Sequence, residues 1–173
     1  PHIFLPPPSA LAGSGRLADK KGYGFDGCSP KILMARAGVT DGLIAFPGGS
    51  SYRLMVLPQV ETMTPGLLAK IRDLVKAGAT IVGTPPVKSP SLSGYPACDS
   101  KVQSLARDLW GSLDVPQTAT QRSYGKGFIH WGGELSAPAP KTPPDAKRHG
   151  LPSLYPSYDL TAALLKGMGV QED

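Results

Sequence analysis

Two glutamates, Glu61 and Glu134, are the side chains of this sequence that could most readily do chemistry together. Each follows an apolar run with the composition of a buried strand, at 54–57 and at 128–131. Two carboxylates that meet at one edge of a sheet could act as a general acid and a general base, or could hold a cation. Glutamates that are exposed or hydrogen-bonded are commoner, so the spacing by itself assigns no catalytic residue.

Other reactive residue types occur without the surroundings that their chemistry needs. Ser89, Ser91 and Ser93 lie in a loop that lacks the Gly-x-Ser-x-Gly turn of a hydrolase nucleophile, and we interpret them as turn hydroxyls. Cys28 and Cys98 have no histidine or cysteine partners at metal-ligand spacing, and whether the two pair in a disulfide is open. The glycines of a phosphate-binding loop are also missing. We therefore expect no metal site and no cofactor.

A strand-helix-strand unit is the strongest structural signal around these residues. Apolar runs at 53–58 and 79–84 enclose an amphipathic helix that Thr64 and Pro65 begin and Gly78 ends. A crossover helix of this kind joins parallel strands that are buried on both faces. The loops that follow such strands share one edge of the sheet, and we expect Glu61 and Glu134 there.

The remaining segments extend this unit into a three-layer α/β sandwich with a mostly parallel sheet. An antiparallel hairpin and long proline-rich loops are expected beside it. The further predicted elements are a short helix at 31–37 with its core residues Ile32, Leu33 and Met34, a hairpin formed by 43–46 and 54–57, a helix that Asp99 caps and Gly111 ends, a strand at 128–131 and a helix from Ser157.

Composition and charge limit the classes of function. The chain has 173 residues with 21 glycines and 19 prolines, and we predict a Pro/Gly-rich arm or linker at 1–22 followed by a single α/β domain at 23–173. The net charge of +5 is spread along the chain, whereas a nucleic-acid surface needs clustered basic residues. No apolar run approaches the roughly 20 residues of a membrane span. Nucleic-acid and membrane partners are therefore not expected.

Five stretches are more specific than a generic strand-helix pattern. They are 51–58, Glu61-Thr62-Met63-Thr64, 77–83, the loop from Ser89 to Pro96, and Trp131-Gly132-Gly133-Glu134. Together they resemble segments of glycoside hydrolase family 106, the α-L-rhamnosidases.

The resemblance implies a secreted or periplasmic bacterial enzyme whose catalytic glutamates and calcium site lie in a (β/α)₈ barrel. This chain would correspond to the α/β domain after the barrel, flavodoxin-like and similar to class I glutamine amidotransferases and to the trimerisation domain of family 42 β-galactosidases. A barrel of about 250 residues cannot fit in this chain, so no catalytic residue is carried over. The resemblance also implies that a strand before the Pro-rich arm is missing, which would leave a sheet edge uncovered.

Three functions remain open at this point. The first is a non-catalytic domain that supports the barrel of the same polypeptide or shapes its cleft for rhamnose-containing glycans. The second is a small hydrolase that uses Glu61 and Glu134. The third is a carbohydrate-binding or oligomerisation module, and so a homo-oligomer, with exposed Tyr95, Trp131 and Tyr155. For the first function, the candidate cleft or domain-contact residues are Glu61, Thr62, Ser89, Ser91, Trp131 and Glu134.

Overall fold

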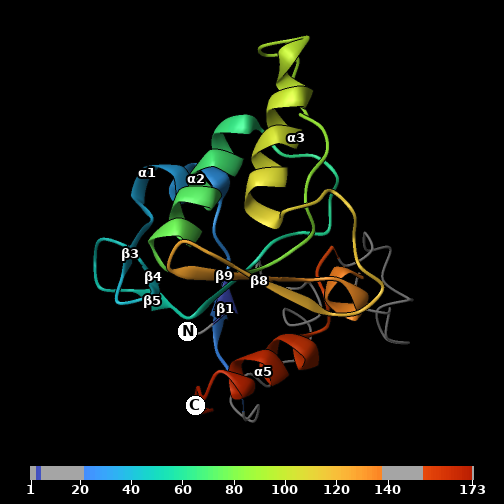
Figure 1. Ribbon diagram of the computed structural model, residues 1–173. Coiled ribbons are helices and arrows are strands. Elements are labelled where there is room, and N and C mark those ends of the chain that lie inside the picture. Colours follow the sequence, from blue (N-terminus) through green and yellow to red (C-terminus); the bar gives the residue numbers. More distant parts are fainter. Residues whose placement is uncertain (1–2, 5–21, 138–153, 173) are drawn as a thin grey trace, which may run out of the picture.

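A six-stranded sheet with helices on both faces forms the centre of the molecule (Figure 1). The computed structural model describes residues 3–4, 22–137 and 154–172. Within them, neighbouring strands of this sheet run parallel, except for the last pair, which is antiparallel. In sheet order the strands are β2 (Phe25–Asp26), β1 (Ile3–Phe4), β6 (Leu54–Val56), β7 (Thr80–Val82), β9 (Gly127–Trp131) and β8 (Thr120–Tyr124).

The predicted three-layer α/β arrangement with a mostly parallel sheet is confirmed. Figure 1 shows α2 (Pro65–Ala77) and α3 (Ala97–Trp110) on one face of the sheet and α5 (Tyr158–Gly167) on the other. Every residue of β6 and β7 is buried, as expected for strands covered on both sides. Their side chains alternate between two apolar clusters. Met55 and Ile81 belong to the cluster under α2 and α3, whereas Val56 and Val82 pack with Leu165 of α5.

The strand-helix-strand unit forms as predicted because its local signals agree with its packing. The Thr64 hydroxyl accepts a hydrogen bond from the Leu67 N–H at 3.4 Å, and Pro65 opens α2. Gly78 ends the helix with φ at 131°, a conformation that disfavours other residues. The predicted helix from Ser157 is found as α5, and the Ser157 hydroxyl caps it by accepting a hydrogen bond from the Leu160 N–H at 3.4 Å.

Two predicted helix details are wrong. Asp99 does not cap α3, which begins at Ala97; the Asp99 carboxylate instead accepts the Ser89 N–H at 2.8 Å. In α1 (Pro30–Arg36), Leu33 is buried, but the expected core residues Ile32 and Met34 are 48% and 44% exposed. The reason is that this short helix packs against the domain along one narrow side only.

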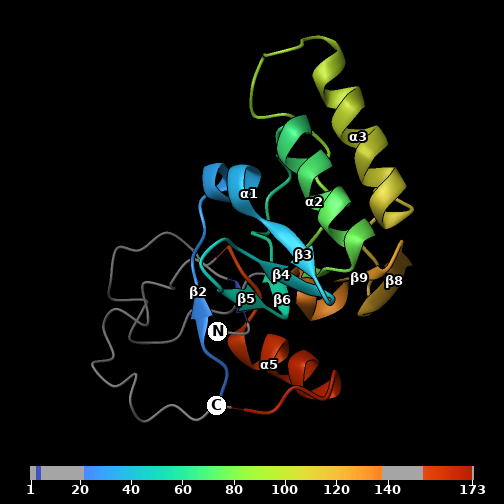
Figure 2. The same cartoon turned by 90° about the vertical axis from the view of Figure 1, so that its left-hand side faces the viewer.

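The predicted hairpin has a different second strand. β4 (Leu43–Ala45) pairs antiparallel with β5 (Ser51–Tyr52) and with β3 (Gly38–Thr40), which together form a separate three-stranded sheet (Figure 2). A tight turn explains this pairing, since the Phe46 N–H donates to the Ser50 carbonyl at 2.9 Å. The run 54–57 pairs in the main sheet, as the strand-helix-strand unit predicts, and not with β4.

Tyr52 connects the two sheets. Its hydroxyl donates to the Asp26 carboxylate at the end of β2, at 2.8 Å. Burial, followed by the hydrogen bond to Asp26, raises the pKa of Tyr52 from 10.0 to about 12. The phenol therefore keeps its proton, and this link, at neutral pH.

Part of the predicted Pro/Gly-rich arm forms a strand of the main sheet, while the expectation of a missing strand before the arm stays a prediction. Ile3 and Phe4 form β1, which lies between β2 and β6 and pairs with both in parallel. Residues 1–2 and 5–21 of the predicted arm fall outside the described residues, and the division into an arm and a domain remains a prediction. Cys28 and Cys98 are free thiols. No described helix has the length and apolar character needed to cross a bilayer.

Candidate functional site

The carboxyl ends of β6, β7 and β9 form the edge at which the candidate residues were expected. These three strands are adjacent and parallel, so the loops that follow them leave from the same side of the sheet. Backbone hydrogen bonds continue past the strand ends, because the Gly83 N–H donates to the His130 carbonyl at 3.1 Å. The indole N–H of Trp110 reaches from α3 to the Gly83 carbonyl at 2.9 Å. The edge is therefore held in place by the helix layer above it.

Glu61 and Thr62 lie beside the loop that follows β7. The Glu61 carbonyl accepts hydrogen bonds from the N–H groups of Val87 and Lys88, at 2.8 and 3.1 Å. Thr62 forms a parallel bridge with Lys88. These contacts use the backbone and leave the Glu61 and Thr62 side chains exposed.

Ser89 and Ser91 use their hydroxyls within the same loop. The Ser89 hydroxyl donates to the Ser91 carbonyl at 3.0 Å and accepts the Ser91 N–H at 3.3 Å. The Ser91 hydroxyl accepts the Ser93 N–H at 3.1 Å. The interpretation of these serines as turn hydroxyls is confirmed, and the loop joins them to Glu61 and Thr62 in one group of candidate residues.

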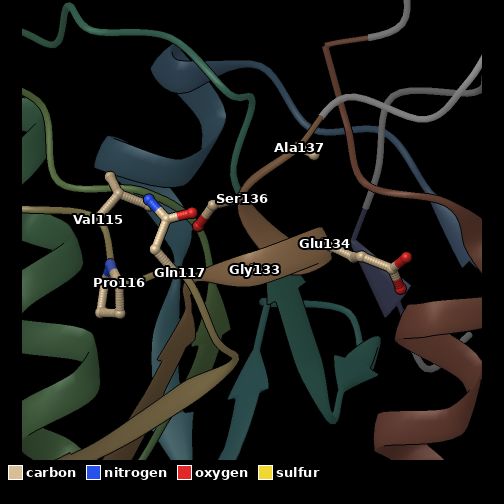
Figure 3. A pocket seen from close by; sticks show the side chains of 7 residues that line it. All are labelled: Val115, Pro116, Gln117, Gly133, Glu134, Ser136 and Ala137. Carbon is tan, nitrogen blue, oxygen red and sulfur yellow. The ribbon is translucent and has the colours of Figure 1, made fainter.

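Trp131 and Glu134 form a second group at the end of β9. Glu134 belongs to the short helix η2 (Gly133–Ser136) and lines an open cleft of about 410 Å³. Figure 3 shows the amide of Gln117 and the hydroxyl of Ser136 on one side of this cleft, while the Glu134 carboxylate points to the opposite side, toward α5. The cleft is lined by Val115, Pro116, Gln117, Gly133, Glu134, Ser136 and Ala137.

Glu61 and Glu134 lie on different loops of this edge. Glu61 is not among the residues that line the cleft beside Glu134, and its backbone is paired with the loop at 87–88. Figures 1 and 2 both show that loop running along α3 to the far end of the helix, away from η2. General acid-base catalysis needs both groups within hydrogen-bond reach of one substrate, so the geometry gives no support to a two-glutamate hydrolase.

Three buried polar groups lie at this edge, and of these Gln59 had no signal in the sequence. His130 is 8% exposed, and burial lowers its pKa below the ordinary value of 6.5. The Gln59 side chain donates from Nε2 to the Leu135 carbonyl at 3.1 Å, but its Oε1 is buried with no partner among the described residues. The Trp131 Nε1 is likewise buried and unpaired there. An apolar run hides such groups, because a pattern of burial does not show which hydrogen bonds will form.

The three aromatic residues that were expected on the surface differ in how far they are exposed. Tyr95 is 71% exposed, as predicted, and Tyr155 is half-buried. Trp131 is only 5% exposed and belongs to the cluster under α2 and α3, so the prediction of an exposed Trp131 is wrong. It lies in a strand that is covered by helices, which leaves no aromatic face for a ligand.

Metal-binding geometry is not found in the described part of the chain. No group of three or more histidine, cysteine, aspartate or glutamate side chains gathers there as a metal site.

Comparison with known proteins places this α/β fold in a glycoside hydrolase family. The profile of glycoside hydrolase family 106, alpha-L-rhamnosidase, matches residues 9–149, and the chain belongs to this family. A protein of Formosa agariphila named "Putative beta-glucuronidase" is 45% identical over 73 residues, which are 42% of this chain and 6% of that protein.

A solved structure supports the fold. A rhamnosidase from Novosphingobium sp. PP1Y superposes with a TM-score of 0.62 at 22% sequence identity. The match covers 99% of this chain and 14% of the rhamnosidase. The chain thus spans a small part of the length of both relatives.

Proposed function

We propose that this chain acts as a non-catalytic α/β domain of a family 106 glycoside hydrolase, one that supports the catalytic barrel or shapes its cleft. The observation that carries the proposal is the separation of the two candidate carboxylates. Glu134 lines one cleft, whereas Glu61 is placed beside the loop at 87–88. The hydroxyls of Ser89 and Ser91 are already used in turns. These contacts give no support to an acid-base pair formed by the two glutamates or to a nucleophile formed by either serine.

The finer fold assignment belongs to the same proposal. The parallel strands have the order β2-β1-β6-β7-β9, which corresponds to 2-1-3-4-5 when they are numbered along the chain. This is the order of flavodoxin-like sheets, and it supports a flavodoxin-like domain similar to class I glutamine amidotransferases. In that class of fold, ligands bind at the carboxyl ends of the strands, where the candidate residues lie.

The partner in this proposal is the catalytic barrel of the same polypeptide, acting on rhamnose-containing glycans. The short coverage of both relatives supports it, since this chain matches 6% of one and 14% of the other. The setting, a bacterial enzyme that is secreted or periplasmic, rests on the family alone.

Substitution of the two glutamates in the complete polypeptide tests the proposal. We expect Glu61→Gln and Glu134→Gln to retain hydrolysis of an aryl α-L-rhamnoside, with kcat within about threefold of the parent, because a removed general acid or base costs about 10²–10⁴. Glu172→Gln, near the carboxyl end of the chain, is the matched surface control. A loss of a hundredfold or more in kcat for either glutamate, with the control unchanged, would overturn the proposal.

A further inference from the structure

A projecting loop at 89–96 presents the most exposed large apolar side chains of the described residues. Leu92 is 81% exposed and Tyr95 is 71% exposed. Figures 1 and 2 show the loop beyond the N-terminal end of α3, at the far end of the molecule from α5. Among the described residues, most of the surface of both side chains is left uncovered.

The base of this loop is fixed on two sides. Toward α3, the Gln103 amide donates to the Val87 carbonyl at 3.1 Å, and the Asp99 carboxylate accepts the Ser89 N–H at 2.8 Å. On the other side, the Met63 N–H donates to the Lys88 carbonyl at 3.0 Å. A loop that is held in this way loses little conformational entropy when it binds a partner.

The tip of the loop uses its own polar groups. The Tyr95 N–H donates to the Leu92 carbonyl at 3.0 Å, which closes a turn. The serine hydroxyls satisfy the N–H groups of Ser91 and Ser93. Because these donors are paired within the loop, covering them adds little cost of polar desolvation, and burial of the Leu92 side chain and the Tyr95 ring is favourable.

The size of the tip indicates what kind of partner it fits. Burying an aromatic side chain removes about 150–250 Å² from water, so two side chains supply far less than the roughly 1,200 Å² of a stable interface between separate proteins. A partner in the same polypeptide needs less area, because the linkage gives an effective concentration that is often about millimolar. This chain matches only 6% of the length of one relative and 14% of the other, which is consistent with a partner domain in the same polypeptide.

We infer that the 89–96 loop docks this domain onto another domain of the same polypeptide, with Leu92 and Tyr95 inserted into an apolar groove of that domain. This inference rests on the proposed function and specifies the contact through which the domain would act.

Hydroxyl-radical labelling of the isolated chain and of the complete polypeptide tests the inference. We expect Leu92 and Tyr95 to be oxidised readily in the isolated chain, and several-fold more slowly in the complete polypeptide. Equal oxidation in the two forms would overturn it. Protection that appears in the isolated chain as its concentration rises would also overturn it, in favour of a second copy as the occupant.

Paired substitutions provide a second readout. The double variant Leu92→Ser, Tyr95→Ser should leave the Tm of the isolated chain unchanged, because both side chains are exposed there. In the complete polypeptide it should lower the Tm of this domain by about 2 °C or more. Met168→Ser, whose side chain is 41% exposed at the end of α5, is the control and should change neither. An unchanged Tm in the complete polypeptide contradicts the inference.

A failure of the docking inference can be told apart from a failure of the proposed function. The proposed function fails if the glutamate variants lose activity, whatever the labelling shows. The docking inference fails if the tip stays exposed, whatever the activity of those variants.

Discussion

The two tryptophans of this chain form a natural pair for measuring what holds the carboxyl edge of the sheet in place. Trp110 and Trp131 are 1% and 5% exposed and pack in the same apolar cluster. They differ in one respect. The Trp110 indole donates to the Gly83 carbonyl at 2.9 Å, whereas the Trp131 Nε1 is buried with no partner among the described residues.

Replacement of each by phenylalanine removes a similar volume and a similar apolar area, so the packing loss is shared. Trp110→Phe also breaks a hydrogen bond and leaves the Gly83 carbonyl unpaired, which costs about 1–3 kcal/mol. Trp131→Phe breaks no bond and removes an N–H whose burial is itself unfavourable. We therefore expect Trp110→Phe to lower the free energy of unfolding by at least about 1 kcal/mol more than Trp131→Phe.

Urea unfolding followed by far-UV circular dichroism measures this difference directly. The slope m should be the same for both variants, because both expose the same surface on unfolding. The corresponding difference in Tm is about 2–4 °C for a domain of this size. Equal destabilisation, or a larger loss for Trp131→Phe, would refute the assignment of the Trp110 bond as the tie between α3 and the sheet edge.

Two further predictions concern pH and packing. Burial lowers the pKa of His130 below 6.5, so the unfolded chain binds a proton at a higher pH than the folded chain does. The contribution of neutral His130 to the free energy of unfolding is therefore complete above pH 6.5 and is lost as the pH falls through the pKa of the folded state. His130→Gln should flatten the pH dependence of the free energy of unfolding between pH 7 and pH 5, and an unchanged slope would contradict it. Gly127→Ala should destabilise the domain by about 3 kcal/mol or more, since the new Cβ would collide with the backbone carbonyls of Ala79 and Val75. Gly66→Ala in α2 is the control, where the new Cβ meets only the Met34 Cε at 3.7 Å; comparable unfolding midpoints for the two alanine variants would contradict the packing described here.

The strand-helix-strand unit could be predicted because its signals are local and consistent. Thr64, Pro65 and Gly78 mark the ends of α2, and apolar runs on both sides are long enough to be buried strands. Strand β8 has no such signal. Its sequence Thr-Gln-Arg-Ser-Tyr alternates between intermediate and exposed positions, because it lies at the edge of the sheet and pairs only with β9. β1 is similarly hidden, since two residues cannot show a periodicity.

The candidate site was less predictable for a physical reason. The carboxyl ends of parallel strands lie at one edge of a sheet, so the sequence could predict that Glu61 and Glu134 lie at the same edge. Where each carboxylate finally lies depends on the loops, and the pairing of Glu61 with Val87 and Lys88 is a long-range backbone contact with no local signature. The burial of Trp131 depends in the same way on which helices cover the strand that carries it.

We propose that this domain contributes no catalytic group of its own. The most direct test is the rate at which the isolated chain releases the aryl group from an aryl α-L-rhamnoside, measured beside the complete polypeptide at equal molar concentration. We predict no release above the buffer rate from the isolated chain, with its fold verified by circular dichroism, and clear turnover by the complete polypeptide. Turnover by the isolated chain that disappears in Glu61→Gln or Glu134→Gln would contradict the account.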